Sequence, residues 1–441
     1  MASRIETSFL SRTARSLEPP LSFPAAGHSV AIVGFGTVGR SVARILAEHP
    51  HPWLRLTQVC TRNVQRRQVS WLPSRVTWTE AFDDVLASDA DIVVELIGGL
   101  EPAADWVRAA LQSGKSVVTA NKKLIAYYGP ELNELARQHG CRLLFGASVA
   151  GGVPVISGLQ EGLAGDQLSR ICGILNGTCN FILSRIETGG VSFDVALKQA
   201  QKLGFAEADP TDDVTGYDAR AKLAILVRLA LHTEVHPDQI PCRPISPIHG
   251  VDFAYAKDLG CTIRQVSCAE LIDGRLLASV QPALVPLSSP LARVQDSLNL
   301  VMATGQYGGE TVFSGHGAGG DPTAVAVVSD LIALVHGAKH AGQHLGQPVA
   351  RPVTSDFSSR HYLRLTITDR PGILAEIAAV LSKHEINIDA VLQHPGYDRA
   401  HLPFVVTLDE CANSVVERAM KEINTLDFLV QPTLNLPILE K

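Results

Sequence analysis

Short apolar runs alternate with segments of helical periodicity over the first third of the chain. The runs with the length of a buried strand are residues 29–33, 56–60, 91–97 and 116–118. A helical pattern over 41–48 follows the first run. Buried strands separated by helices are typical of an open parallel sheet. The pattern therefore predicts an α/β fold, with a Rossmann-type nucleotide-binding domain over residues 28–147.

The pattern changes beyond residue 147. The segment 170–175 predicts another strand and 181–187 a helix, and short apolar runs broken by Pro and Gly over 236–320 predict an antiparallel sheet. A long apolar helix is predicted at 324–335. Together these elements indicate an α+β substrate and dimerisation domain over residues 148–340.

Two segments frame these domains, and a smaller module follows them. Residues 1–27 are predicted to be a disordered tail. Residues 341–360, with several Gly, Pro, Ser and Thr, are predicted to be a linker. Residues 361–441 then show a βαββαβ order of strands and helices. Because all candidate catalytic residues precede the linker, we expect this module to be separable from the chemistry.

A glycine-rich turn lies between the first predicted strand and its helix. A G-x-G-x-x-G motif in this context makes the turn, admits a pyrophosphate to the backbone and lets the helix pack on the strand. A glycine-rich connection without a ligand is the alternative. The candidate cofactor contacts are Gly34, Phe35, Gly36, Thr37, Val38 and Gly39.

The end of the second predicted strand indicates which cofactor the domain prefers. NAD-binding domains place an acid here for the ribose 2′-hydroxyl, whereas this chain has Thr61-Arg62-Asn63. A guanidinium suits the 2′-phosphate of NADP. We therefore expect Arg62 to favour NADP, with NAD also possible.

Composition narrows the class of partner. The 441 residues contain 38 Lys and Arg against 44 Asp and Glu, and no basic block suggests nucleic acid or a membrane surface. No apolar run is long enough to span a bilayer. Eight cysteines without a C-x-x-C pair argue against a zinc site or disulfide framework and for a reducing cytoplasm. A small-molecule substrate is the expected partner.

An acidic stretch followed by a lysine carries the strongest chemical signal. Five carboxylates fall between residues 207 and 218, and Asp218 lies four residues before Lys222 on a predicted helix. Lys222 falls at the edge of the apolar face, where burial lowers a lysine pKa and nearby acids raise it. This spacing fits a proton donor, and it also fits a surface helix with an ordinary ion pair.

The same stretch resembles the signature of homoserine dehydrogenase. The matching positions are Gly204, Glu207, Asp209, Pro210, Asp212, Asp213, Gly216, Asp218 and Lys222. The resemblance implies that Lys222 is the catalytic proton donor, that Glu207 and Asp218 bind the amino end of the substrate, and that Asp213 supports them. It also implies a cofactor contact at Gly204.

Further motifs extend the resemblance along the chain. The N-G-T-x-N turn implies substrate contacts at Gly177 and Thr178, and the T-A-N-K-K segment implies that Lys122 reaches cofactor and substrate. Glycine turns at Gly98 and Gly317 imply further cofactor contacts.

One segment departs from the family pattern. Homoserine dehydrogenases hold a sodium ion with a glutamate and nearby carbonyls, and Gly146 stands where that glutamate belongs. The carbonyls of Val149, Gly151 and Val153 remain as candidate ligands. We therefore expect weak or absent dependence on a monovalent cation.

The last module resembles an ACT domain through its D-R-P-G-I-L-A segment. The resemblance implies feedback by an amino acid, with threonine as the expected regulator, and a homo-oligomer, dimer or tetramer. A purely dimerising module is the alternative.

Together these features favour an NADP-preferring homoserine dehydrogenase that interconverts L-aspartate 4-semialdehyde and L-homoserine in threonine, methionine and isoleucine biosynthesis. Two rivals use the same residues differently. An acylating aldehyde dehydrogenase would use Cys179 as its nucleophile. A catalytically silent NADP-binding sensor would need no proton donor, although this chain has one in Lys222.

Overall fold

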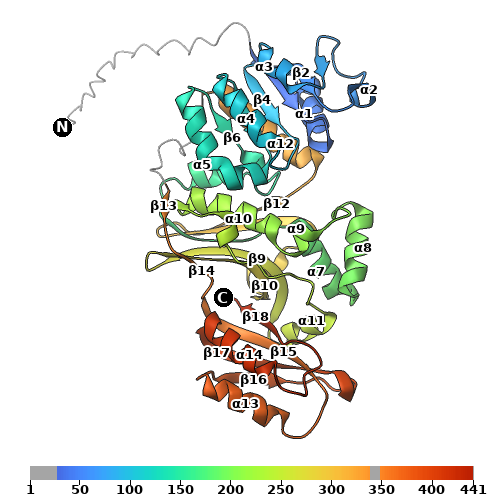
Figure 1. Ribbon diagram of the computed structural model, residues 1–441, viewed down its shortest axis with the longest axis vertical. Coiled ribbons are helices and arrows are strands. Elements are labelled where there is room, and N and C mark those ends of the chain that lie inside the picture. The colour runs from blue at the N-terminus through green and yellow to red at the C-terminus, as the bar shows by residue number, and fades with distance from the viewer. Residues whose placement is uncertain (1–26, 338–347, 441) are drawn as a thin grey trace, which may run out of the picture.

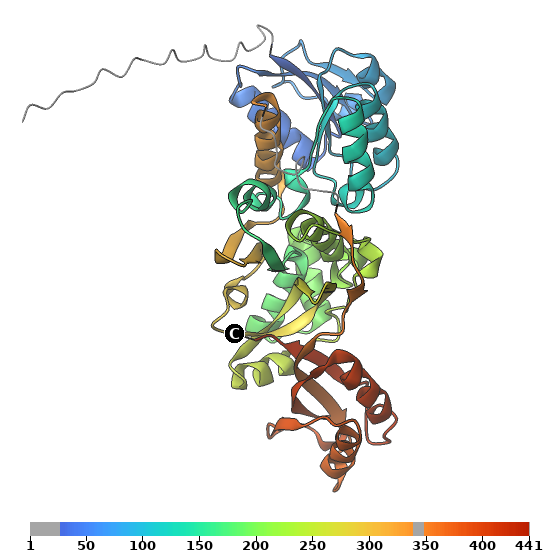
Figure 2. The ribbon, with the colours of Figure 1, turned by 90° about the vertical axis from the view of Figure 1, so that its left-hand side faces the viewer.

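The computed structural model describes residues 27–337 and 348–440 as three parts stacked along one axis (Figures 1 and 2). The expected tail at 1–27, apart from Gly27, and the linker residues 341–347 lie outside the described residues. Within the described ranges, no helix has both the length and the apolar character to cross a membrane.

The first part is a sheet of six parallel strands in the order β3-β2-β1-β4-β5-β6. The strands are β1 (His28–Val33), β2 (Leu54–Cys60), β3 (Thr77–Thr79), β4 (Ile92–Glu95), β5 (Ser116–Thr119) and β6 (Leu143–Leu144). The helices between them are α1 (Thr37–Glu48), α2 (Val64–Arg67), α3 (Phe82–Ala87), α4 (Ala103–Gln112) and α5 (Lys122–Gln138). The predicted Rossmann-type domain is confirmed.

A helix from much later in the chain completes this part. The apolar helix α12 (Gly320–Val335) packs beside α1, and its Ala324, Val327 and Leu331 share a buried core with Val42 (Figure 1). At its start, Asp321 accepts hydrogen bonds from Ser41 (2.7 Å) and Arg44 (2.5 Å) of α1. After the substrate domain, the chain thus returns to the first domain and packs beside the helix that follows the glycine-rich turn.

The second part holds antiparallel strands, as the pattern over 236–320 predicts. Its main strands are β7 (Leu168–Ile174), β9 (Cys261–Ile272), β10 (Arg275–Pro286), β11 (Leu298–Gly305) and β12 (Gly309–His316). Short strands at its margin are β8 (Thr233–Glu234), β13 (Val349–Ala350) and β14 (Val353–Thr354). The helices are α6 (Val155–Ser157), α7 (Gly177–Gly189), α8 (Phe193–Leu203), α9 (Thr211–Val214), α10 (Tyr217–Ala230) and α11 (Gly250–Asp258).

The third part has the predicted βαββαβ order. Its elements are β15 (Ser358–Ile367), α13 (Ile373–Lys383), β16 (Ile388–Leu392), β17 (Leu402–Ala412), α14 (Asn413–Ile423) and β18 (Leu434–Ile438). Strand β18 pairs antiparallel with β15 and parallel with β10, where Ile438 stands opposite Leu284. The second and third parts therefore share one continuous sheet.

This shared sheet argues against a separable C-terminal module, although separability from the chemistry stays a prediction. Tyr362 and Leu436 are buried in one core with Phe181 and Tyr255 of the second part. Removing the module would expose that core and leave β10 without its neighbour β18. The composition of residues 341–360 did not indicate the shared sheet, because the strand that joins the two parts, β18, comes after α14, far beyond that segment.

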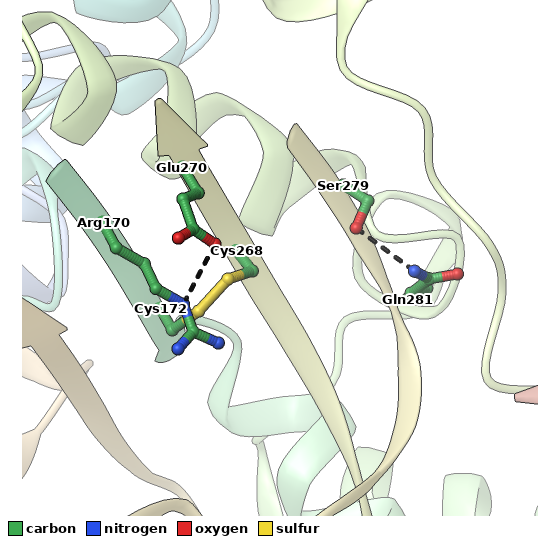
Figure 3. Close-up of a disulfide and its surroundings, with 6 residues drawn as sticks. All are labelled: Arg170, Cys172, Cys268, Glu270, Ser279 and Gln281. Atoms are coloured by element: carbon green, nitrogen blue, oxygen red, sulfur yellow. Dashed lines mark hydrogen bonds and ion pairs between the residues drawn. A yellow bond between two sulfur atoms is a disulfide. The ribbon is translucent and has the colours of Figure 1, made fainter. Parts of the chain in front are cut away.

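The expectation of unpaired cysteines is wrong for two of them. Cys172 on β7 and Cys268 on β9 stand opposite each other and form a disulfide, with the Arg170–Glu270 ion pair (3.7 Å) beside it (Figure 3). They are 96 residues apart, so their spacing could not reveal the pair; the strand register brings them together. The other six cysteines are free thiols.

The disulfide predicts a specific thiol count for protein purified without reductant. Alkylation after unfolding is expected to label the six free cysteines, and all eight only after reduction, as counted by mass spectrometry. Cys172→Ser is expected to leave Cys268 as a seventh labelled site. Labelling of all eight cysteines before reduction would contradict the pairing.

Candidate active site

The predicted Asp218–Lys222 pair forms, and it is buried. Helix α10 begins just after Gly216, which has a φ of +92°. Glycine adopts this conformation without strain, whereas other residues would be strained. One turn later Lys222 Nζ donates to Asp218 Oδ2 (2.8 Å) and to the Leu175 carbonyl (2.7 Å). Asp218 is 4% exposed and Lys222 9% exposed. The alternative of an ordinary surface pair does not hold.

A second lysine reaches the same carboxylate from the nucleotide-binding domain. Lys122 begins α5, and its Nζ forms an ion pair with Asp218 Oδ1. The turn before it is fixed by Asn121, which accepts a hydrogen bond from Leu124 N (3.2 Å) and donates to the Gly99 carbonyl (2.7 Å). Asp218 therefore lies between one lysine from each domain, at the junction where a cofactor and a substrate can meet.

Asn176 joins this cluster, although sequence reasoning selected only its neighbours in the N-G-T-x-N turn. Its Nδ2 donates to Asp213 Oδ1 and Asp218 Oδ2, both at 2.7 Å. Its Oδ1 accepts from Cys179 N (2.7 Å) and so caps α7. In the sequence, an asparagine just before a predicted helix indicates a helix cap. It does not indicate hydrogen bonds to the two carboxylates.

The environment pushes the pKa values of the two lysines in opposite directions. Burial lowers the pKa of Lys222, and its attraction to Asp218 opposes this only in part. Attraction to Asp218 raises the pKa of Lys122. Burial alone would raise the pKa of Asp218, but Lys222 and Lys122 outweigh it and hold that pKa low. Lys222 is thus the better prepared of the two lysines to give up a proton.

The other predicted substrate residues surround this cluster at different depths. Burial raises the pKa of Asp213, which shares Asn176 with Asp218. Thr178 is nearly buried and donates to the Phe205 carbonyl (2.7 Å), while a Cβ on Gly177 would lie 2.7 Å from the Ser297 carbonyl oxygen. Glu207 is exposed, and among the described residues its carboxylate makes no hydrogen bond or ion pair. The structure thus brings Asp213 to the lysines and leaves Glu207 on the neighbouring loop.

The dinucleotide turn has the geometry that its glycines predict. A Cβ on Gly34 would lie 2.7 Å from the Leu96 carbonyl carbon, and one on Gly39 only 2.0 Å from the Gly34 oxygen. Gly36 faces open space before the free N–H groups of α1. The Phe35 ring is buried edge-on to Trp78, with ring centroids 4.9 Å apart, so only its backbone is available to a ligand. The arrangement fits a pyrophosphate.

The remaining predicted cofactor residues rim the same edge of the sheet. Arg62 is exposed just after β2, and Gly98 is exposed in the turn after β4. Gly317 packs beside Gly151, where a Cβ on Gly151 would lie 2.6 Å from the Gly317 oxygen. Gly204 follows α8 in the substrate domain, where it is exposed and has a left-handed conformation.

Sequence reasoning missed Glu95, which shapes this rim. Glu95 ends β4 and is buried, and its Oε1 accepts from Ile97 N (2.8 Å) and Gly98 N (3.2 Å). Its Oε2 accepts from Thr119 Oγ1 (2.6 Å) at the end of β5. Burial raises its pKa despite these bonds. The only available signal was an acid that interrupts the apolar run 91–97.

The segment expected to bind a cation lies against a carboxylate from another element, that of Asp330 in α12. Gly146 N donates to Asp330 Oδ2 (2.7 Å), and a Cβ on Gly146 would lie 2.6 Å from Asp330 Oδ1. The carbonyls of Val149, Gly151 and Val153 follow, although Val153 O already accepts from Val155 N (2.7 Å). Among the described residues, no three His, Cys, Asp or Glu side chains gather as a metal site. The oxygen atoms near Gly146 are therefore one carboxylate and backbone carbonyls, and weak dependence on a cation stays a prediction.

Replacing the buried Asp330 is expected to stabilise the folded protein by an amount that depends on pH. Burial raises its pKa to about 7, whereas the pKa of an aspartate in an unfolded chain is near 3.8. The unfolded state therefore binds fewer protons between these values, and the stability that Asp330 contributes falls as pH rises from about 4 to about 7. Asp330→Asn keeps an acceptor for Gly146, so its gain in melting temperature should be larger near pH 8 than near pH 5. An equal change at both pH values would contradict this assignment.

Cys179 does not have the environment of a nucleophile. It is fully buried, and burial raises its pKa well above the usual range. Its Sγ donates to the Asp213 carbonyl (3.1 Å), so the thiol is held as a donor in the protonated form. This geometry disfavours the acylating aldehyde dehydrogenase.

The fold and site together define a nicotinamide-nucleotide-dependent oxidoreductase with a lysine pair at its domain junction. Residues 34–146 match the family model "Homoserine dehydrogenase, NAD binding domain", residues 154–332 match "Homoserine dehydrogenase", and residues 361–428 match "ACT domain". The chain is 38% identical over 392 residues to the homoserine dehydrogenase of Bacillus subtilis, covering 86% of this chain and 90% of that protein. The chain belongs to the homoserine dehydrogenase family.

Solved structures agree with this family. A homoserine dehydrogenase from Thiobacillus denitrificans has a TM-score of 0.86 and 34% identity, covering 94% of this chain and 98% of that one. A hyperthermophilic archaeal homoserine dehydrogenase mutant in complex with NADPH has a TM-score of 0.61 and 26% identity, covering 71% of this chain and 99% of that one.

Proposed function

We propose that the chain interconverts L-aspartate 4-semialdehyde and L-homoserine and prefers NADP. The observation that carries the reaction is the Lys222–Asp218–Lys122 cluster at the junction of the two domains, in which Asp218 and Lys222 are buried and Lys122 is partly exposed. The preference for NADP rests on Arg62, which is exposed just after β2. When bound, the nicotinamide ring supplies or accepts the hydride. The glycine turn at Gly34, Gly36 and Gly39 would hold the cofactor's pyrophosphate.

Lys222 gives a proton to the aldehyde oxygen as negative charge develops there, and takes it back in the reverse direction. The Leu175 carbonyl and Asp218 fix its ammonium group. Lys122, whose pKa is raised, stays charged and stabilises the same oxygen. Glu207 and Asp218, supported by Asp213, are assigned to the substrate's amino end, and Gly177 and Thr178 are assigned as further substrate contacts.

The biological setting is part of the same proposal. The product feeds threonine, methionine and isoleucine biosynthesis in the cytoplasm, and threonine acts through the ACT domain of a dimer or tetramer. The family's role in amino-acid biosynthesis and the amino-acid-binding character of ACT domains support this.

One assay separates the proposal from its rivals. L-homoserine should drive NADP reduction at alkaline pH, where release of a proton favours oxidation, and D-homoserine should not. An acylating enzyme would instead need phosphate or a thiol and would be inactivated by alkylation. A silent sensor would bind NADP without turnover.

The cofactor preference predicts the effect of Arg62→Asp. Because the guanidinium pairs with the 2′-phosphate, the KM for NADP should rise strongly while the KM for NAD changes little. Arg75→Asp makes the same charge change at an exposed position beyond α2 and should alter neither constant. Equal increases in both constants for Arg62→Asp would show that this loop is not the selector.

A further inference from the structure

A cavity of about 570 Å³ lies between the ACT domain and the substrate domain of the same chain. One wall is formed by α14 and β18, and the other by the segment 243–249 with Pro282 of β10. The Asp369-Arg370-Pro371-Gly372 turn, through which the module resembles an ACT domain, does not line it. The volume suits a small metabolite.

The charges that face this cavity match a zwitterion. Glu417 and Lys421 are four residues apart on α14 and therefore share one helix face. Arg243 pairs with Glu417 across the cavity (2.5 Å). Lys421 is exposed and makes no ion pair within the described residues. A zwitterionic ligand requires a cation for its carboxylate and a carboxylate for its ammonium group. Lys421 provides the cation, and Glu417 provides the carboxylate if the ligand replaces Arg243 as its partner.

Buried polar groups around the cavity lack partners among the described residues. They are Arg364 Nε, Thr433 Oγ1 and Asn435 Nδ2, on side chains at most 6% exposed. The other amide atom of Asn435 contacts His361 Nδ1 (3.0 Å), so either orientation of that amide leaves one atom unpaired. A buried polar group without a partner is unfavourable, and a polar ligand with small side-chain adjustments would satisfy these groups.

The rest of the lining is apolar, with Pro244, Pro282, Met420 and Leu436. We propose that this junction cavity binds an α-amino acid with an apolar or weakly polar side chain. Lys421 holds its carboxylate, Glu417 its ammonium group, and the apolar wall its side chain. The inference deepens the proposed amino-acid regulation by giving it a site within one chain, between two domains.

A short path of contacts connects this cavity to the active site. Arg243 N donates to the Val280 carbonyl (2.9 Å), and Ile245 N donates to the Val214 carbonyl (3.1 Å), next to Asp213. A Cβ on Gly216, which precedes α10, would lie 3.0 Å from Val280. A ligand that displaces the segment 243–249 therefore acts on the acidic turn that holds Asp213 and Asp218. We expect it to change the KM for homoserine more than the KM for NADP.

The test uses the full chain, with each proteinogenic L-amino acid as the probe in calorimetry and in the dehydrogenase assay. We expect at least one amino acid to bind. Lys421→Glu removes a charged hydrogen bond and Met420→Trp fills the space, so each should weaken that binding at least about tenfold. Arg418→Glu, an exposed position on α14 outside the lining, should leave it unchanged. Melting temperatures of all variants confirm folding.

The possible results separate this site from the proposed reaction. Absence of binding by every amino acid, or binding that both cavity variants leave intact, would overturn the site. Binding that depends on Lys421 in a chain without homoserine-dependent NADP reduction would support the site while refuting the reaction.

Discussion

Replacing Lys222 by Met is expected to lower kcat in both directions by about 10² to 10⁴-fold, the usual contribution of a positioned general acid. NADPH binding should stay nearly intact, because the glycine turn that holds the cofactor lies in the other domain. Methionine keeps the apolar stem of the lysine and removes its ammonium group, with the hydrogen bonds to Asp218 and the Leu175 carbonyl. The measurements are kcat with homoserine and with aspartate semialdehyde, and an NADPH fluorescence titration.

Lys123→Met provides the matched control. Lys123 is half-buried, with its side chain 42% exposed, and it pairs with Asp212 (2.5 Å) near the surface, where such pairs contribute about 0 to 1 kcal/mol. Its kcat should be close to that of the unaltered enzyme. A near-normal kcat for Lys222→Met would contradict the assignment and move the proton transfer to Lys122.

Asp252→Ala is expected to lower the free energy of unfolding by about 3–5 kcal/mol, because it leaves a buried guanidinium unpaired. Asp252 lies in the first turn of α11, and its Oδ2 accepts from Arg364 Nη1 (2.7 Å) of β15. Its Oδ1 accepts from Tyr362 Oη (2.8 Å). Both charged side chains are at most 3% exposed, and burial raises the pKa of Asp252 despite the arginine. This pair joins the ACT domain to the substrate domain.

Asp258→Ala, on the same helix, is the control for this substitution. Asp258 contacts His394 Nε2 at 2.5 Å near the surface, so its loss should cost about 1 kcal/mol or less. Urea unfolding of both variants gives the comparison. Similar midpoints for the two variants would show that the buried pair does not hold the domains together.

The sequence predicted the elements well but placed the start of three helices four residues late. Helices expected from residues 41, 181 and 324 begin at Thr37, Gly177 and Gly320. Their first turns are rich in Gly and Thr, so apolar periodicity does not mark them. These turns carry the free N–H groups that suit a ligand, which is why the error falls at functional positions.

The candidate site was predictable where chemistry and helical spacing coincide. Asp218 and Lys222 are four apart on one helix, so their contact follows from the spacing. The contact of Lys122 with Asp218 depends on how two domains meet, and local periodicity has no information about that. Asn176 was hidden for a similar reason, since its two carboxylate partners lie on elements far along the chain.

Three further features depended on long-range packing. Strand register pairs Cys172 with Cys268, and the space left by Gly146 is filled by Asp330 from a helix that returns to the first domain. The joining of β18 to β10 makes one sheet of two domains. Each is set by contacts between distant segments, which composition and periodicity do not report.

Transfer of deuterium from homoserine to NADP tests the central claim most directly. Homoserine deuterated at its hydroxymethyl carbon is incubated with the enzyme and NADP, and the NADPH formed is analysed by mass spectrometry. Direct hydride transfer at the Lys222 site predicts NADPH that carries one deuterium. Unlabelled NADPH, or no NADPH at all, would contradict the proposed reaction.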